Sequence, residues 1–107
     1  MEIKKILEVS HLYDYYADLL SDKQREYLKN YYFEDLSLTE MAEIYGVSKQ
    51  AISTNIKRSL ADLEDYEKKL SLIESSNQRK FILNEITKIN KDDDIANLIE
   101  HLLKLEN

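Results

Sequence analysis

The stretch that decides the fold is residues 37–52, which read SLTEMAEIYGVSKQAI. Ser37 stands three residues before Glu40, and this capping-box spacing predicts the start of a helix. Gly46 should end that helix, because a glycine can take the positive φ that reverses the chain. Ser48 is placed to cap a second helix immediately afterwards. Two helices joined by so short a turn form a helix-turn-helix.

Three apolar positions in this stretch have packing roles that fit the same motif. Ala42 is small where the two helices should cross, Val47 should fill the corner between them, and Ile52 should anchor the second helix to the core. The second helix is long, and its apolar residues recur at spacings of four, four and three. They are Ile52, Ile56, Leu60 and Leu63. The sequence therefore predicts a helix-turn-helix from Ser37 to about Leu63.

The outward side of the second helix carries side chains suited to contacting nucleic acid. Its glutamine could read the edge of a base, its three cations could contact phosphates or guanine, and its two hydroxyls could do either. These candidate nucleic-acid-binding residues are Lys49, Gln50, Ser53, Thr54, Lys57 and Arg58. The alternative is that they form a solvated helix face in a fold that has lost its DNA-binding role.

Helical patterns also fill the N-terminal part of the chain. Apolar residues at spacings of three and four predict one helix over residues 3–20. Ser21 and Gln24 form a second capping box, which predicts another helix from Asp22 to about Phe33. These two helices precede the helix-turn-helix.

The pattern beyond Tyr66 leaves two alternatives open. Either one helix continues to about Asn90, or the chain bends or breaks near Ser75. We favour the break, because the serines and the asparagine of the polar stretch 74–77 compete for backbone hydrogen bonds. The three aspartates at 92–94 then predict the start of a last helix, since they can cap it and complement its dipole.

The composition favours an all-α protein. The 107 residues include no proline and one glycine, so little in the chain interrupts helices. We expect one structural unit, made of a helix-turn-helix domain over 1–70 and a helical extension over 71–107 that either packs on the core or forms a dimer contact. The chain has no cysteine, its first eight residues lack the uninterrupted apolar stretch typical of a signal peptide, and no apolar run reaches membrane-spanning length. We therefore expect a cytoplasmic protein with no membrane partner.

The net charge of −6 opposes binding to a polyanion, but the charge is unevenly distributed. Residues 48–58 carry three basic side chains and no acidic one, and this is the cationic segment of the chain. Three positive charges offer few phosphate contacts, so one chain should bind DNA weakly. We therefore expect a homodimer with two recognition helices about 34 Å apart, one turn of DNA. The expected contact is the last helix, with Leu98, Ile99, Leu102, Leu103 and Leu105.

No motif in the sequence indicates catalysis or a bound cofactor. There is no nucleophile elbow, no pair of catalytic carboxylates and no glycine-rich phosphate loop. His11 and His101 belong to no metal-ligand cluster, and the aspartates at 92–94 lack the glycine and closing glutamate of an EF-hand. Most of the eight tyrosines should pack in the core, although a minority could stack RNA bases. We expect no enzymatic activity, no metal and no cofactor.

The segment from Leu12 to Leu72 resembles the YlxM family of small bacterial helix-turn-helix proteins. Six short stretches carry the resemblance: LLSDKQ at 19–24, YY at 31–32, DLSL at 35–38, VSKQAI at 47–52, NIKR at 55–58 and YEKKL at 66–70. More distantly, the same segment is similar to region four of bacterial sigma factors, which reads a promoter element.

The resemblance implies an all-helical fold, with a helix-turn-helix of the sigma factor region four type, in chains that dimerise. The family is encoded beside components of the signal recognition particle, which implies a regulatory role in that targeting pathway, with the particle's RNA or protein as partner. This sequence differs from the family at Lys49, where arginine is common, and at Ser53 and Thr54, which replace a tyrosine and an acidic residue.

Two functions remain open at this point. In the first, the protein is a non-catalytic regulator in the targeting pathway that binds nucleic acid. In the second, it is a sequence-specific DNA-binding transcriptional regulator with no direct role in protein targeting. DNA recognition should discriminate among sequences, whereas binding to the particle's RNA or protein should ignore duplex sequence.

Overall fold

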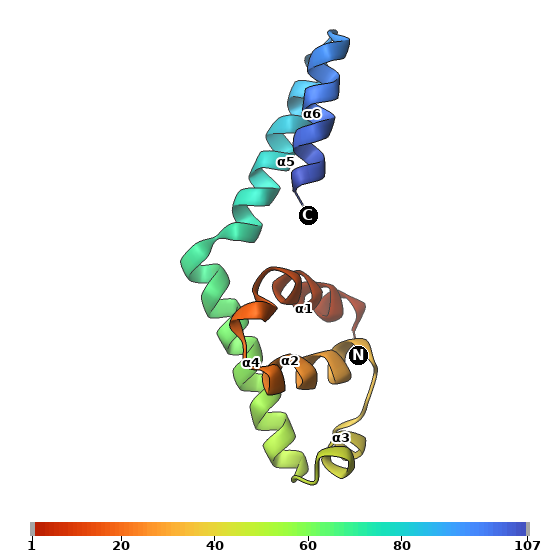
Figure 1. Ribbon diagram of the computed structural model, residues 1–107, viewed down its shortest axis with the longest axis vertical. Helices are drawn as coiled ribbons and strands as arrows, with labels where there is room; N and C mark the ends of the chain where they lie inside the picture. Colours follow the sequence, from red (N-terminus) through yellow and green to blue (C-terminus); the bar gives the residue numbers. More distant parts are fainter. Residues whose placement is uncertain (1, 107) are drawn as a thin grey trace. The chain divides into compact units, whose positions relative to one another are not determined.

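The computed structural model describes residues 2–106, and every regular element in that range is a helix (Figure 1). The α-helices are α1 (Ile3–Tyr16), α2 (Asp22–Leu28), α3 (Leu38–Tyr45), α4 (Lys49–Leu70), α5 (Leu72–Ile89) and α6 (Asp93–Leu105). A short 3₁₀ helix, η1 (Ala17–Leu19), follows α1, and a π-helical turn, η2 (Lys29–Phe33), follows α2. The predicted all-α class is confirmed. The chain divides between Leu70 and Ser71 into an N-terminal and a C-terminal compact unit.

Both capping boxes expected from the sequence are present in the N-terminal unit. The Ser21 hydroxyl accepts the Gln24 N–H at 3.2 Å, while the Gln24 side chain accepts the Ser21 N–H at 3.0 Å. Ser37 and Glu40 form the same reciprocal pair at 3.0 and 3.1 Å. Because each pair satisfies two backbone N–H groups that lack a helical partner, the starts of α2 and α3 are fixed locally.

The core of the N-terminal unit lies around α4, which packs against α1, α2 and α3. Its buried residues recur at spacings of four, three and four: Ile52, Ile56, Ser59 and Leu63. The prediction that Leu60 belongs to this stripe is wrong, because Leu60 is only half-buried and Ser59 is fully buried. The Ser59 hydroxyl donates to the Asn55 carbonyl at 2.8 Å, which satisfies its polar atom inside the core.

Tyrosine rings line this core with their hydroxyls toward its edge. Tyr16 and Tyr27 are buried. The Tyr16 hydroxyl donates to a Glu67 carboxylate oxygen at 2.5 Å and so joins α1 to the last turns of α4. The Tyr13 ring meets Phe33 edge to face, with centroids 5.2 Å apart. The other six tyrosines are only half-buried, so the prediction that most of the eight pack in the core is met by two of them.

The long helix ends earlier than the sequence suggested. Ser71 adopts the left-handed conformation, with φ 53° and ψ 31°, and separates α4 from α5. Of the two alternatives, the break is therefore present and the continuous helix is not, but the break lies four residues before Ser75, which is inside α5. Ser76 is buried there, and its hydroxyl donates to Glu106 at 2.6 Å. A satisfied hydroxyl no longer competes for the helix backbone, so the polar stretch stays helical.

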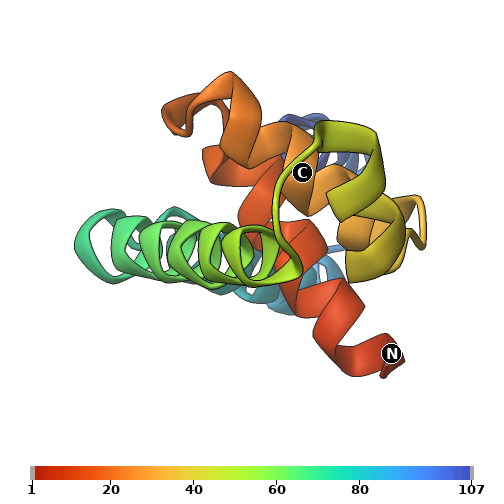
Figure 2. The same cartoon turned by 90° about the horizontal axis from the view of Figure 1, so that it is seen from below.

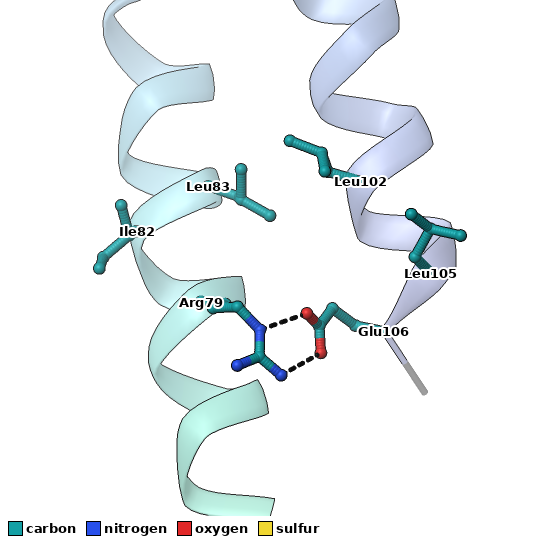
Figure 3. A pocket seen from close by; sticks show the side chains of 6 residues that line it. All are labelled: Arg79, Ile82, Leu83, Leu102, Leu105 and Glu106. Carbon is teal, nitrogen blue, oxygen red and sulfur yellow. Dashed lines mark hydrogen bonds and ion pairs between the residues drawn. The ribbon is translucent and has the colours of Figure 1, made fainter. Parts of the chain in front are cut away.

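The C-terminal unit is a hairpin in which α5 and α6 lie side by side and run in opposite directions (Figure 1). Asp92 caps α6 by accepting the Ile95 N–H at 3.1 Å, as predicted from the aspartate cluster. Arg79 on α5 donates from Nε to Glu106 at 2.5 Å (Figure 3). The hydrogen bonds from Arg79 and Ser76 lower the pKa of Glu106 to about 2.

Candidate nucleic-acid interface

The turn between α3 and α4 has the geometry that a helix-turn-helix needs. Gly46 adopts φ 66° and ψ 34°, and its N–H donates to the Ala42 carbonyl. The Val47 N–H donates to the same carbonyl at 3.2 Å. Figure 2, a view from below, shows the two helices joined by this short turn. The predicted role of Gly46 is confirmed, because only a residue tolerant of positive φ closes the helix in this way.

The apolar side chains at the corner between α3 and α4 pack only partly as predicted. Ile52 is completely buried and anchors α4, as predicted. Val47 is 37% exposed, so it covers the corner only partly. Ile44, on α3, is 62% exposed and adds an apolar side chain to the surface beside the turn. The corner is thus closed by the backbone bonds of the turn more than by an apolar plug.

The start of α4 is held by Ser48, whose hydroxyl accepts the Ala51 N–H at 3.0 Å. This cap satisfies one of the free N–H groups at the beginning of the helix. The residues that follow form the candidate surface. Because Ser48 and the turn at Gly46 fix where α4 begins, they also fix which side chains its first turns present.

Of the six candidate residues, five are exposed and Ser53 is half-buried. Gln50, Thr54 and Lys57 follow one another at spacings of four and three, which places them on a common face. The Gln50 amide also donates to the Thr54 hydroxyl at 3.4 Å. Lys49 and Arg58 flank that face, while Ser53 lies toward the buried side of the helix. The structure therefore brings together Gln50, Thr54 and Lys57 as the centre of the candidate surface.

The three cations of this surface are available for an external anion. Among residues 2–106, no carboxylate lies within ion-pair distance of Lys49, Lys57 or Arg58. Lys69, near the end of the same helix, is different, because it pairs with Asp65 at 2.8 Å. A helix-turn-helix contacts the phosphate backbone through cations that are not already paired, and the first turns of α4 offer such cations.

Helix α3, which precedes this surface in the chain, carries exposed acidic side chains, a feature that was not predicted from the sequence. Glu40 and Glu43 are exposed on α3, and Glu34 and Asp35 are exposed just before it. The first helix of a helix-turn-helix crosses the nucleic-acid backbone, so these carboxylates repel phosphates and weaken binding by one chain. The spacing of three between Glu40 and Glu43 could have predicted that these two carboxylates share the outward side of the first helix.

A tyrosine on α3 holds the helix-turn-helix against α2. The Tyr45 hydroxyl donates to Glu26 at 2.8 Å and accepts from the Asn30 amide at 2.5 Å. Its ring lies 4.7 Å, centroid to centroid, from that of Tyr27. Burial, followed by the hydrogen bond to Glu26, raises the pKa of Tyr45 from 10.0 to about 12. Sequence periodicity could not indicate this network, because its members come from separate helices.

Replacing Tyr45 with phenylalanine is expected to lower the free energy of unfolding by about 1 kcal/mol, the usual net value of one hydrogen bond. The folded pKa lies above the unfolded value, so this stabilisation is complete below pH 10 and disappears as the pH rises through about 12. Urea unfolding of wild type and Tyr45→Phe from pH 8 to 12 measures it. A difference between the two proteins that does not shrink across that range would contradict the assignment.

Metal-binding clusters and membrane-spanning helices are both absent from the described part of the chain. Within residues 2–106, no group of three or more histidine, aspartate or glutamate side chains is arranged to hold a metal ion. None of the helices described there is long and apolar enough to cross a membrane.

The fold and the exposed face at the start of α4 define a helix-turn-helix protein. Residues 3–103 match the family model UPF0122, described as "Putative helix-turn-helix protein, YlxM / p13 like". The chain belongs to this family, and the resemblance seen in its motifs is confirmed.

Bacterial relatives match over the whole length of the chain. The UPF0122 protein YlxM of Bacillus subtilis (strain 168) is 41% identical over 110 residues, covering 99% of this chain and 100% of the relative. A UPF0122 protein of Geobacillus sp. (strain WCH70) is 42% identical, covering 97% and 99%. One from Streptococcus pneumoniae (strain 70585) is 44% identical, covering 100% and 98%. The family is one of helix-turn-helix proteins and not a family of enzymes.

Proposed function

We propose that this protein is a non-catalytic cytoplasmic regulator that binds nucleic acid through the first three turns of α4. One observation carries the proposal: the exposed cations Lys49, Lys57 and Arg58 have no ion-pair partner among the described residues and lie on or beside the face that carries Gln50 and Thr54. The cations contact phosphates, and the amide and hydroxyl are placed to contact base edges.

The acidic side chains of α3 and the small number of cations make binding by a single chain weak. The protein therefore acts as a homodimer, in which two recognition helices double the number of phosphate contacts. This arrangement also explains how a chain with a net charge of −6 can bind a polyanion.

The nucleic acid is either duplex DNA or the RNA of the signal recognition particle. The family resemblance favours a regulatory role in the targeting pathway, with the particle's RNA or protein as the partner. A sequence-specific transcriptional regulator is the alternative. The cations of α4 suit both, because contacts to phosphates do not depend on the sugar, whereas insertion of α4 into a major groove suits duplex DNA alone.

Fluorescence anisotropy tests the proposal. The ligands are labelled duplex DNA from the protein's own locus, a scrambled duplex and signal recognition particle RNA, each titrated across a salt series. The variant Lys49→Ala/Lys57→Ala/Arg58→Ala should bind at least about tenfold more weakly, and its salt slope should fall by about one for each phosphate that is no longer neutralised. The matched control Lys4→Ala/Lys68→Ala/Lys91→Ala removes the same charge from other exposed sites and should keep the wild-type slope.

The ligand series also separates the two regulatory roles. Preference for the locus duplex over the scrambled one would make the protein a transcriptional regulator. Preference for the particle's RNA would place it in the targeting pathway. Equal weakening in the two triple variants, or no binding to any nucleic acid at low salt, would refute binding through α4.

A further inference from the structure

A hollow of about 370 Å³ lies between α1 and η2 in the N-terminal unit. Ser10, Tyr13 and Asp14 line it from α1, and Lys29 and Phe33 line it from η2. Tyr13 and Asp14 follow Ser10 at spacings of three and four, so the three side chains share one side of α1. The volume is at the lower end of the range for small-molecule sites. The hollow therefore has room for a small ligand.

Two opposite charges line this hollow without pairing. Asp14 and Lys29 are both exposed, and neither side chain is in an ion pair among residues 2–106. A carboxylate and an ammonium that line one hollow but stand too far apart to pair leave space between them for a ligand that bonds to both. Such a ligand carries an anionic group for Lys29 and a cationic group for Asp14.

The apolar wall of the hollow is a corner made by two aromatic rings. Tyr13 and Phe33 meet edge to face, with their ring planes 78° apart and their centroids 5.2 Å apart. Phe33 is 37% exposed, so part of its ring is open to a ligand. A third ring can pack offset against one of these rings and present its edge to the other, as aromatic groups prefer. The wall therefore favours a ligand with an aromatic ring.

The backbone beside the hollow adopts two uncommon conformations. The turn η2 is π-helical, and the Glu34 N–H donates to the Lys29 carbonyl at 3.0 Å where that turn ends. Asp35, two residues after Phe33, adopts a φ of 56°, in the left-handed region. π-Helical turns and strained residues other than glycine occur frequently at functional sites. Their presence next to Lys29 and Phe33 supports a binding role for this turn.

We propose that this hollow binds a free aromatic amino acid. The Lys29 ammonium donates to the carboxylate of the ligand, and the ammonium of the ligand donates to the Asp14 carboxylate. The ring of the ligand packs into the corner between Tyr13 and Phe33. A nucleotide fits less well, because Asp14 repels its phosphate and a single lysine neutralises it. The site does not depend on the proposed function, since it shares no residue with the first turns of α4.

Titration of the isotope-labelled full chain with L-phenylalanine, followed by NMR, tests the proposal. The dissociation constant should be about 0.1–1 mM, as expected for a ligand of about twelve heavy atoms in an open site. The amide signals of the five residues that line the hollow should shift, and those of Lys49 and Gln50 should not. No saturable shift up to about 10 mM, or saturable shifts confined to α5 and α6, would overturn the proposal.

Analogues that each lack one group test the contacts separately. N-acetylphenylalanine lacks the ammonium, phenylalaninamide lacks the carboxylate and leucine lacks the ring. Each should bind at least about tenfold more weakly than phenylalanine. The first analogue resembles the last residue of a peptide and the second resembles its first residue, so the series also distinguishes a free amino acid from a chain end. An analogue that binds as well as phenylalanine would refute the contact that it lacks and with it the proposed ligand.

A pair of variants tests the two charged residues. Asp14→Asn/Lys29→Gln should weaken phenylalanine binding at least about tenfold with unchanged circular dichroism, because both side chains are exposed. The matched control Lys4→Gln/Asp18→Asn removes the same two charges from exposed positions of α1 and η1 outside the hollow. It should keep the wild-type affinity. Equal affinities in the two variants would show that Asp14 and Lys29 do not hold the ligand.

Discussion

Replacing Leu63 with alanine is expected to lower the free energy of unfolding of the N-terminal unit by about 2–5 kcal/mol. Leu63 is completely buried on α4, the helix against which α1, α2 and α3 all pack. Truncation removes its transfer free energy and leaves a cavity that several rigid helices cannot close. Because domains are stable by only about 5–15 kcal/mol, this is a large share of the total.

The measurement is thermal unfolding followed by circular dichroism, in which a destabilisation of this size lowers the Tm by at least about 10 °C. Leu70→Ala is the matched control, since Leu70 lies on the same helix and is 51% exposed. Its substitution should change the stability by no more than about 0.5 kcal/mol. Equal effects of the two substitutions would show that α4 is not the centre of the core.

The second large effect is expected from Gly46→Val. Gly46 adopts a φ of 66°, which a β-branched residue reaches only with strain of about 2 kcal/mol. No neighbouring atom lies within 4 Å of a Cβ placed there, so the cost is one of backbone conformation and not of crowding. Relief of this strain would move the start of α4, and the affinity for nucleic acid should fall together with the stability.

Gly46→Asn is the matched control for backbone strain. Asparagine also adds a side chain, but it visits the left-handed region far more readily than valine. It should keep most of the stability and of the affinity measured by anisotropy. If Gly46→Val matched Gly46→Asn in Tm and in binding, the left-handed turn would not control the position of α4.

Several features could be predicted from the sequence because they depend on neighbours along the chain. The pairs Ser21–Gln24 and Ser37–Glu40 fix two helix starts through bonds three residues apart, and both are present as expected. Gly46 ends α3 for an equally local reason. Six short stretches between Leu19 and Leu70 indicated the family, which the family model confirms. The exposure of five candidate residues followed from the periodicity of α4.

Other features depended on contacts between residues far apart in the chain. Ser59 is buried, although Leu60 was the residue expected to face the core. The neighbouring helices determine which side of α4 faces inward. The helix break falls at Ser71 and not near Ser75, since Ser76 finds a partner thirty residues away in Glu106. The bonds joining Tyr45 to Glu26 and Asn30 arise in the same way.

Local sequence was enough to predict the starts of α2, α3, α4 and α6, the turn at Gly46 and the family, because capping hydrogen bonds and apolar periodicity depend on residues close together in the chain. Tertiary structure decided which polar residues are buried, where the long helix stops and which side chains of α1 and η2 line one hollow. Those outcomes depend on the packing of distant helices, in which a hydroxyl or carboxylate is tolerated only when a partner from another element satisfies it.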